Sequence, residues 1–312
     1  MQRTDTLHSE SPGVTRVDLR WRGLPGQIAA YLVEDGGELA VVDCGPGSTL
    51  DGLLHAIRAT GHEPEALTHV LVTHVHLDHA GAAGALLHAA PRARVYVHPR
   101  GVRHLADPSR LLSSASRIYG DRMDALWGTM IPVPEERIRI LDDGAEVRIG
   151  RRVLRAWATP GHAVHHNAFH DPAAGLLFSG DAGGIRLPGA AYVRPPTPPP
   201  DVDVAAWRAS IGRMRALGAE RIFPTHFGGS GEVAWHLDDL ERRLSEWAEW
   251  SGRRLAEGVT PEALTDELRG RAHAEVLAAG GTDALAEAYE AAVPTAMMAA
   301  GLVRYHQVHA AP

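Results

Sequence analysis

The sequence predicts an α+β protein of 312 residues that ends in a helical C-terminal extension. Two observations support this fold class. From residue 14 onward, short apolar and β-branched runs alternate with segments that have helical spacing. After Gly231 the apolar residues fall at alternating steps of four and three, which is the spacing of an amphipathic helix. We therefore expect a sheet-containing domain over residues 1–231 and a helical extension over residues 232–312.

The first predicted elements are strands joined by short helices. The runs AAYLVED and ELAVVDCG, separated by Gly36-Gly37, indicate a hairpin. Residues 48–61 predict a helix that is capped by Ser48 and stopped by Gly61. THVLVTH predicts a short buried strand, AGAAGALLHAA a helix of small residues, and ARVYVH another strand.

The middle of the chain predicts an insertion and then more strands. Residues 99–134 carry a mostly helical pattern, which could cap a site or pack outside the core. Residues 137–162 predict three strands with tight turns at Asp143-Gly144 and Gly150-Arg151. GLLFSGD and AERIFPTH predict two more strands, and the proline-rich residues 194–203 an extended surface loop.

The helical extension has clear start signals. An apolar seam predicts a first helix that ends near Gly258, and further helices are expected to begin at Thr260-Pro261, Thr282 and Thr295. The apolar stretch PTAMMAAGLV in the last helix favours packing, and a homodimer face is one use for it.

The composition excludes several classes of function. Apolar residues make up 45% and charged residues 22%, and no run of about 18 apolar residues that could span a membrane occurs. With no basic region followed by an apolar stretch at the N-terminus, we expect a cytoplasmic globular protein. The net charge of -7, without a basic block, argues against nucleic acid as a partner. All 31 basic residues are arginine, which excludes a Schiff-base or P-loop lysine, and the single Cys44 excludes multi-cysteine metal sites.

The segment THVHLDH concentrates residues that can bind metals directly after a predicted strand. If the chain stays extended, His74, His76 and Asp78 project to one side and His79 to the other. Imidazole and carboxylate groups bind zinc at about 2.0 to 2.2 Å. The spacing therefore predicts two neighbouring metal ions rather than one.

Three more candidate ligands follow predicted strands elsewhere in the chain. His162 lies in ATPGH, Asp181 in FSGD and His226 in FPTH, each beside small or turn-forming residues that allow a close backbone approach. Each position alone is a weak signal, but together they complete the ligand set that two metal ions require.

The motifs THVHLDH, TPGH, SGD and PTHFG, in this order, resemble the metallo-β-lactamase-fold hydrolase superfamily over about the first three-quarters of the chain. The resemblance implies a four-layer αβ/βα sandwich, two mixed sheets packed face to face with helices outside. It implies a first metal on His74, His76 and His162, and a second on Asp78, His79 and His226 with Asp181 bridging. It also implies that Asp43, in VVDCG, lies beneath the metals and orients a ligand histidine.

The resemblance further implies a hydrolase with two divalent metal ions, zinc being expected and iron or manganese being alternatives. A metal-bridging hydroxide would attack a small-molecule substrate, and Asp78 would act as both ligand and base. The glyoxalase II and lactonase branch fits best, so a carboxylic ester, lactone or thioester is the expected substrate. A mononuclear iron oxidase of persulfides, a phosphodiesterase and a metal-binding protein without catalytic activity remain alternatives.

Substrate contacts are predicted from position in the chain. Arg186, Tyr192 and Arg194 follow Asp181 where family members often contact substrate, and Tyr119 in the insertion could form an apolar wall with Met123 and Trp127. Of His165 and His166, one is expected to form structural hydrogen bonds and the other to face the pocket. Cys44 is expected to be a buried, inert thiol.

Overall fold

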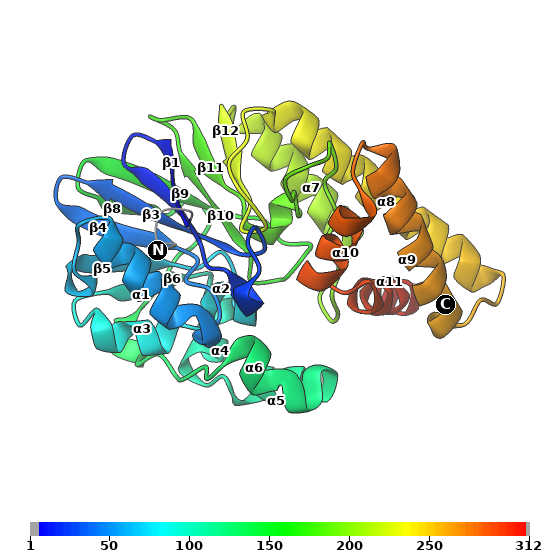
Figure 1. Cartoon of the computed structure of the whole chain (residues 1–312), viewed down its shortest axis with the longest axis horizontal. Coiled ribbons are helices and arrows are strands. Elements are labelled where there is room, and N and C mark those ends of the chain that lie inside the picture. The colour runs from blue at the N-terminus through cyan, green and yellow to red at the C-terminus, as the bar shows by residue number, and fades with distance from the viewer. Residues whose placement is uncertain (1–5, 310–312) are drawn as a thin grey trace.

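A computed structural model describes residues 6–309, so the outermost residues of both predicted domains lie outside the described part (Figure 1). Two mixed sheets form the centre of the molecule. The first sheet has seven strands in chain order: β1 (Leu7–Ser11), β2 (Val14–Asp18), β3 (Ala29–Asp35), β4 (Glu38–Val42), β5 (Leu67–Leu71), β6 (Arg94–Val97) and β7 (Ile138–Ile140). The second runs in the order β12 (Arg221–Phe223), β11 (Leu176–Phe178), β10 (Asn167–Asp171), β9 (Arg152–Ala158) and β8 (Glu146–Ile149).

The two sheets pack face to face because alternate side chains of their strands point to different layers. In β4, Ala40 and Val42 belong to the core between the sheets, whereas Val41 belongs to a second core, which lies beneath the first sheet and is covered by its helices. Tyr31 of the first sheet contacts Phe178 of the second with ring centroids 5.5 Å apart. This arrangement confirms the predicted sandwich.

Helices cover the outer faces of both sheets. Beside the first sheet lie α1 (Leu50–Ala59), α2 (Leu77–Ala80) and α3 (Ala83–Ala89), followed by the helices of the insertion, α4 (Val102–Ala106), α5 (Ser109–Tyr119) and α6 (Met123–Trp127). The second sheet packs against α7 (Val204–Ala216), whose buried Trp207 and Ile211 join the same core as the sheet.

The C-terminal region is helical, as predicted, and comprises α8 (Val233–Ala256), α9 (Pro261–Ala278), α10 (Asp283–Ala292) and α11 (Thr295–His309). The apolar seam of α8 is buried against the second sheet's core. Thr260 and Thr282 cap α9 and α10, because each side chain accepts a hydrogen bond from a backbone N–H three residues later. None of the helices within residues 6–309 combines the length and the apolar content that crossing a membrane requires.

One local prediction is confirmed and one is wrong. The predicted turn at Asp143-Gly144 is present, and it joins β7, which pairs with β6 in the first sheet, to β8, which pairs with β9 in the second. The turn therefore carries the chain from one sheet to the other. Ser48 does not cap α1, since its hydroxyl donates to the carbonyl of Leu126, 2.8 Å away, and ties the helix start to the insertion.

The proline-rich segment is not a surface loop. Residues 192–198 are buried, and the Thr197 hydroxyl donates to the carbonyl of Met298 in α11 at 3.0 Å. The α11 backbone approaches so closely at Gly301 that a Cβ there would meet the Thr197 carbonyl oxygen at 1.9 Å. The segment thus lies between two parts of the molecule. The C-terminal helices are on one side, and the turns that follow strands of the second sheet, such as the one after β9, are on the other.

Candidate metal centre

The ligand-rich segment after β5 does not stay extended, so the condition for the strand-like projection of its side chains is not met. The carbonyl of His76 accepts hydrogen bonds from the N–H groups of His79 and Ala80, which starts the short helix α2. Asp78 and His79 therefore project from a helical turn, while His74 and His76 project from the loop before it. His74 and His76 therefore belong to one cluster, and Asp78 and His79 to another. A helical turn causes this separation, and not the alternation of side chains along a strand that the sequence suggested.

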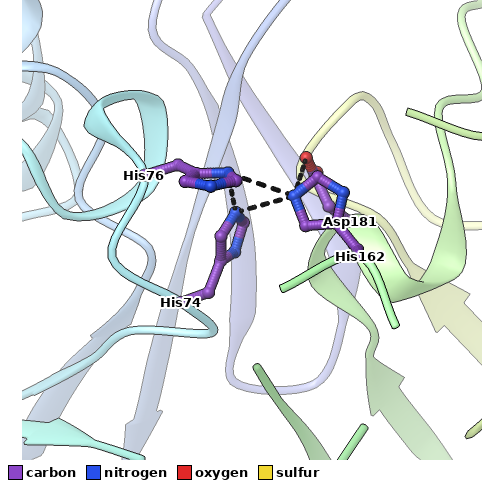
Figure 2. Close-up of side chains that lie close together, drawn as sticks. All are labelled: His74, His76, His162 and Asp181. Carbon is purple, nitrogen blue, oxygen red and sulfur yellow. Dashed lines mark hydrogen bonds and ion pairs between the residues drawn. The ribbon is translucent and has the colours of Figure 1, made fainter. Parts of the chain in front are cut away.

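A first cluster contains His74, His76, His162 and Asp181, whose side chains converge in Figure 2. The Nε2 atom of His74 lies 2.9 Å from Nδ1 of His76 and 3.2 Å from Nε2 of His162. The third side of this triangle, from His76 Nδ1 to His162 Nε2, is 3.1 Å. The cluster brings together residues from the α2 loop, the turn after β9 and the turn after β11.

A second cluster adjoins the first and contains Asp78, His79 and His226. The Oδ2 atom of Asp78 lies 3.2 Å from Nε2 of His226. Asp181 connects the two clusters, since its Oδ2 lies 3.4 Å from Nε2 of His162 and its Oδ1 lies 3.3 Å from Nε2 of His79. Its two oxygens thus face different clusters, which is the geometry a bridging carboxylate needs. The structure brings all seven predicted ligands together.

Three of the histidines are oriented by acceptors on their far side. Nδ1 of His162 faces the carbonyl of Pro196 at 2.8 Å, and Nδ1 of His226 faces that of Gln27 at 2.7 Å. Nδ1 of His79 faces the Asp43 carboxylate at 2.7 Å. Because each Nδ1 donates its hydrogen to an acceptor, Nε2 of the neutral ring carries a lone pair that points into the centre.

The hydrogen-bonding capacity of the centre is not satisfied by the protein itself. In the first cluster, three ring nitrogens lie in mutual contact, yet each pair needs one donor and one acceptor, so a triangle cannot satisfy all three. In the second, His79 Nε2, His226 Nε2 and Asp181 Oδ1 are buried, and because their contacts of 3.2 and 3.3 Å lack the direction of a hydrogen bond, they have no hydrogen-bond partner among the described residues. A cation in each cluster would satisfy these atoms, and imidazoles with carboxylates suit zinc and other first-row divalent metals.

The electrostatics of the two clusters differ. Burial and the neighbouring imidazoles hold the pKa of His74 well below its ordinary value, and the same causes lower the pKa of His76 to about 3. These rings are neutral and ready to act as ligands. Burial also lowers the pKa of His79, but the Asp181, Asp78 and Asp43 carboxylates outweigh it and raise that pKa. The second cluster is therefore built to hold positive charge.

Asp43 holds the centre from beneath, in the place the sequence suggested. It is fully buried, and its φ of 51° aims its carboxylate at the end of β5. Besides His79, it accepts hydrogen bonds from the N–H of Thr73 at 2.8 Å and the hydroxyl of Thr225 at 2.6 Å. The two threonines were missed in the sequence, although each immediately precedes a ligand histidine.

The remaining polar candidates near the centre have structural contacts. His166 pairs with the Thr159 hydroxyl at 2.8 Å and accepts from the N–H of Ala182 at 3.2 Å, as a structural hydrogen-bonder should. His165 is buried and does not belong to the residues that line the pocket described below. Burial raises the pKa of the Cys44 thiol well above its usual range, which makes it inert.

A pocket opens onto the first cluster, with His76, Asp78, His162 and Asp181 at its floor. Its walls are almost entirely apolar: Leu77, Leu111, Ser114, Ala115, Ile118, Tyr119, Trp127, Pro196, Pro198, Pro199, Pro200, Ala292, Val293, Pro294 and Met297. Both the insertion and the C-terminal helices thus cover the candidate centre. The prolines come from the segment expected at the surface, and no sequence signal indicated that Pro196 and Pro198 are buried.

Of the residues predicted to contact the substrate, the structure brings Tyr119 and Trp127 to this pocket, whereas Met123 lies outside its lining. Arg186 bonds the Ser230 hydroxyl and the Glu232 carboxylate, outside the pocket lining. Tyr192 and Arg194 are buried against Tyr289 of α10 instead. These three residues were predicted to contact the substrate because they follow Asp181 in the chain, but the structure places them outside the pocket lining.

Comparison with known proteins yields relatives of the same fold. The chain is 27% identical over 268 residues to the lactamase-like protein vrtG of Penicillium aethiopicum, covering 84% of this chain and 69% of that protein. It is 27% identical over 249 residues to an atrochrysone carboxyl ACP thioesterase of Aspergillus fumigatus, covering 78% and 63%. The chain thus spans roughly two thirds of the length of these two curated relatives.

Solved structures agree on the fold. The structure of the metallo-β-lactamase family protein TTHA1429 from Thermus thermophilus superposes with a TM-score of 0.65 at 22% identity, covering 91% of this chain and 89% of that one. The family model of the metallo-β-lactamase superfamily matches residues 23–226, which include all seven clustered ligands. The chain therefore belongs to the metallo-β-lactamase superfamily, with a His/Asp centre consistent with a metallohydrolase.

Proposed function

We propose that the chain is a hydrolase with two divalent metal ions, most simply zinc, that cleaves a carboxylic ester, lactone or thioester. One observation carries the proposal: an apolar pocket ends on four of the seven metal-ligand candidates. An acyl group placed in this pocket would have its carbonyl at the centre, while its carbon chain contacts the apolar walls.

The seven clustered residues would hold the metals, His74, His76 and His162 on one side and Asp78, His79 and His226 on the other, with Asp181 between them. When bound, the two metals would lower the pKa of a coordinated water toward about 7 and polarise the substrate carbonyl.

Asp78 is the proposed proton acceptor, because its side chain is 17% exposed at the pocket floor whereas that of Asp181 is only 4% exposed. Burial would raise the pKa of Asp78, but His79 and His226 lower it to about 2. The two histidines thus keep Asp78 ionised, so that its carboxylate can accept a hydrogen bond from the attacking water, orient it and relay its proton.

The pocket walls support an uncharged acyl substrate over a phosphate diester. Among residues 6–309, neither arginine nor any other cationic side chain lines the pocket apart from its two candidate ligand histidines. The similarity to a protein named as an ACP thioesterase also supports an acyl substrate. These points favour the glyoxalase II and lactonase-like branch of the superfamily over its phosphodiesterases.

A substrate panel tests this proposal. Protein purified without a metal-binding tag and loaded with zinc would be assayed with acyl p-nitrophenyl esters, acyl thioesters, γ-lactones and bis(p-nitrophenyl) phosphate. We expect hydrolysis of at least one acyl class, its loss on chelation and its return with zinc. Cleavage of the phosphate diester alone would contradict the proposal, and so would one iron per chain with oxygen uptake in the presence of persulfides.

A further inference from the structure

The pocket walls come from two segments that are far apart in the sequence. Helix α5 of the insertion contributes Leu111 and Ile118, and the C-terminal extension contributes Val293 and Met297. Figure 1 shows α5 below the sheets and α11 to their right, and both helices contribute residues to the pocket lining. The pocket is therefore complete only when both segments are in place.

The two segments meet at one polar contact. The Tyr119 hydroxyl of α5 donates a hydrogen bond to the thioether sulfur of Met297 in α11, with the two atoms 3.0 Å apart. Thioether sulfur is a weak acceptor, and methionine adapts its shape readily, so this contact opens at small cost. Burial raises the pKa of Tyr119, so its hydroxyl stays neutral. The contact forms an adjustable boundary between the insertion and the extension.

Charge is confined to the pocket floor. Asp78 and Asp181 are the acidic residues of the lining within residues 6–309, and both belong to the metal centre. Within the described chain, the polar side-chain groups of the walls are the hydroxyls of Ser114 and Tyr119 and the indole N–H of Trp127, which is buried without a hydrogen-bond partner there. A charged or strongly polar group in the upper pocket would lose its hydration without replacement partners, which is costly.

We infer that the pocket binds an extended apolar acyl chain, with its carbonyl at the metal ligands, and that Tyr119 and Met297 set the longest chain accepted. This inference rests on the proposed function for its carbonyl end. The polar carrier arm of a thioester would remain outside, because the apolar walls cannot solvate it. The acyl arm and the leaving group therefore have different surroundings.

The experiment uses the zinc-loaded, full-length protein and varies the length of the substrate's acyl group in one series and of its alcohol group in another. Acyl p-nitrophenyl esters and N-acetylcysteamine thioesters with acyl chains of increasing length form the first series. Acetate esters with alkyl alcohols of increasing length form the second. We expect kcat/KM to rise about fourfold per acyl methylene until the pocket is filled and then to fall. The alcohol series should stay nearly flat.

Two methionine variants test whether Tyr119 and Met297 set the longest acyl chain that the pocket accepts. Met297→Ala removes the side chain that Tyr119 contacts, so the optimum should shift to longer acyl chains. Met123→Ala removes the same atoms from the insertion, but Met123 packs against the core beneath the first sheet and lies outside the pocket lining. This control should leave the optimum unchanged even if it lowers stability. An unchanged optimum in Met297→Ala would overturn the assigned boundary.

A binding measurement separates this inference from the proposed hydrolysis. Alkyl methyl ketones of increasing length mimic the acyl arm without being cleaved, and their affinity would be measured by calorimetry. Length-dependent ketone binding without hydrolysis of any ester or thioester would support the pocket assignment and overturn the hydrolase. Hydrolysis with no dependence on acyl length, or ketone binding that is equal at all lengths, would overturn the pocket assignment.

Discussion

The metal centre and the pocket above it are built in opposite ways. The centre is polar, and three of its histidine ligands are fixed by a second partner, such as Asp43 behind His79 or Pro196 behind His162. The pocket is apolar, and its walls meet through the contact of Tyr119 with a methionine sulfur. The difference suggests that chemistry is set by a rigid centre, while substrate choice is set by an adaptable wall.

The largest effect is expected from breaking the bridge in the centre. Asp181→Ala removes the carboxylate that faces both clusters. Metal content should fall below two per chain, and kcat/KM should fall about 10²- to 10³-fold or more. Elemental analysis and ester hydrolysis would measure both. Asp283→Ala, at a largely exposed carboxylate that pairs with His273, should change neither. An Asp181 variant that keeps two metals would refute the bridging role.

A smaller effect is expected from the residue beneath the centre. Asp43→Asn keeps the size of the side chain, and asparagine tolerates the positive φ of this position. The loss of charge behind His79 should weaken metal binding about 10- to 100-fold. Competition with a chromogenic chelator would measure this change. Thr225→Val removes only one hydrogen bond to Asp43 and should weaken binding less, so an equal loss would argue against an electrostatic role for Asp43.

A substitution in the pocket wall should lower activity without changing the metal content. Leu111→Ala enlarges the pocket wall, and kcat/KM for an acyl ester should fall about tenfold at unchanged metal content. Its neighbour Leu112 packs against the same core beneath the first sheet as Leu111 does but lies outside the pocket lining, so Leu112→Ala serves as a matched control of the same size. If both variants lose activity equally, Leu111 acts through stability rather than through the pocket.

The smallest effect is expected far from both regions. Thr260→Ala removes the N-cap of α9 and should lower the free energy of unfolding by about 1 kcal/mol. Chemical denaturation would measure this loss. Metal content and acyl-chain preference should stay unchanged, and a change in either would show that the helical extension is coupled to the centre.

The same contrast explains what could be predicted from the sequence. The ligand positions were accessible because each metal-binding side chain follows a strand in a short motif, as His226 does in FPTH. The four-layer fold followed from the resemblance that those motifs carry. What surrounds them was harder to predict: the helical turn at Asp78 depends on hydrogen bonds to the His76 carbonyl.

The pocket could not be predicted because its walls depend on tertiary packing. A proline-rich pattern is the same at the surface and in the interior, so only the contact with α11 shows that Thr197 is buried. Arg194 follows Asp181 closely in the chain, yet packing on Tyr289 keeps it away from the pocket. The Asp143-Gly144 turn was predicted, but that it joins one sheet to the other follows only from the strand pairing.

Metal stoichiometry in the wild-type protein tests the central claim most directly. Protein purified without a metal-binding tag would be dialysed against excess zinc and then against metal-free buffer, and analysed for all first-row metals. Seven ligands in two adjoining clusters predict two metal ions per chain. A single ion per chain, unchanged by excess metal, would contradict the dinuclear centre.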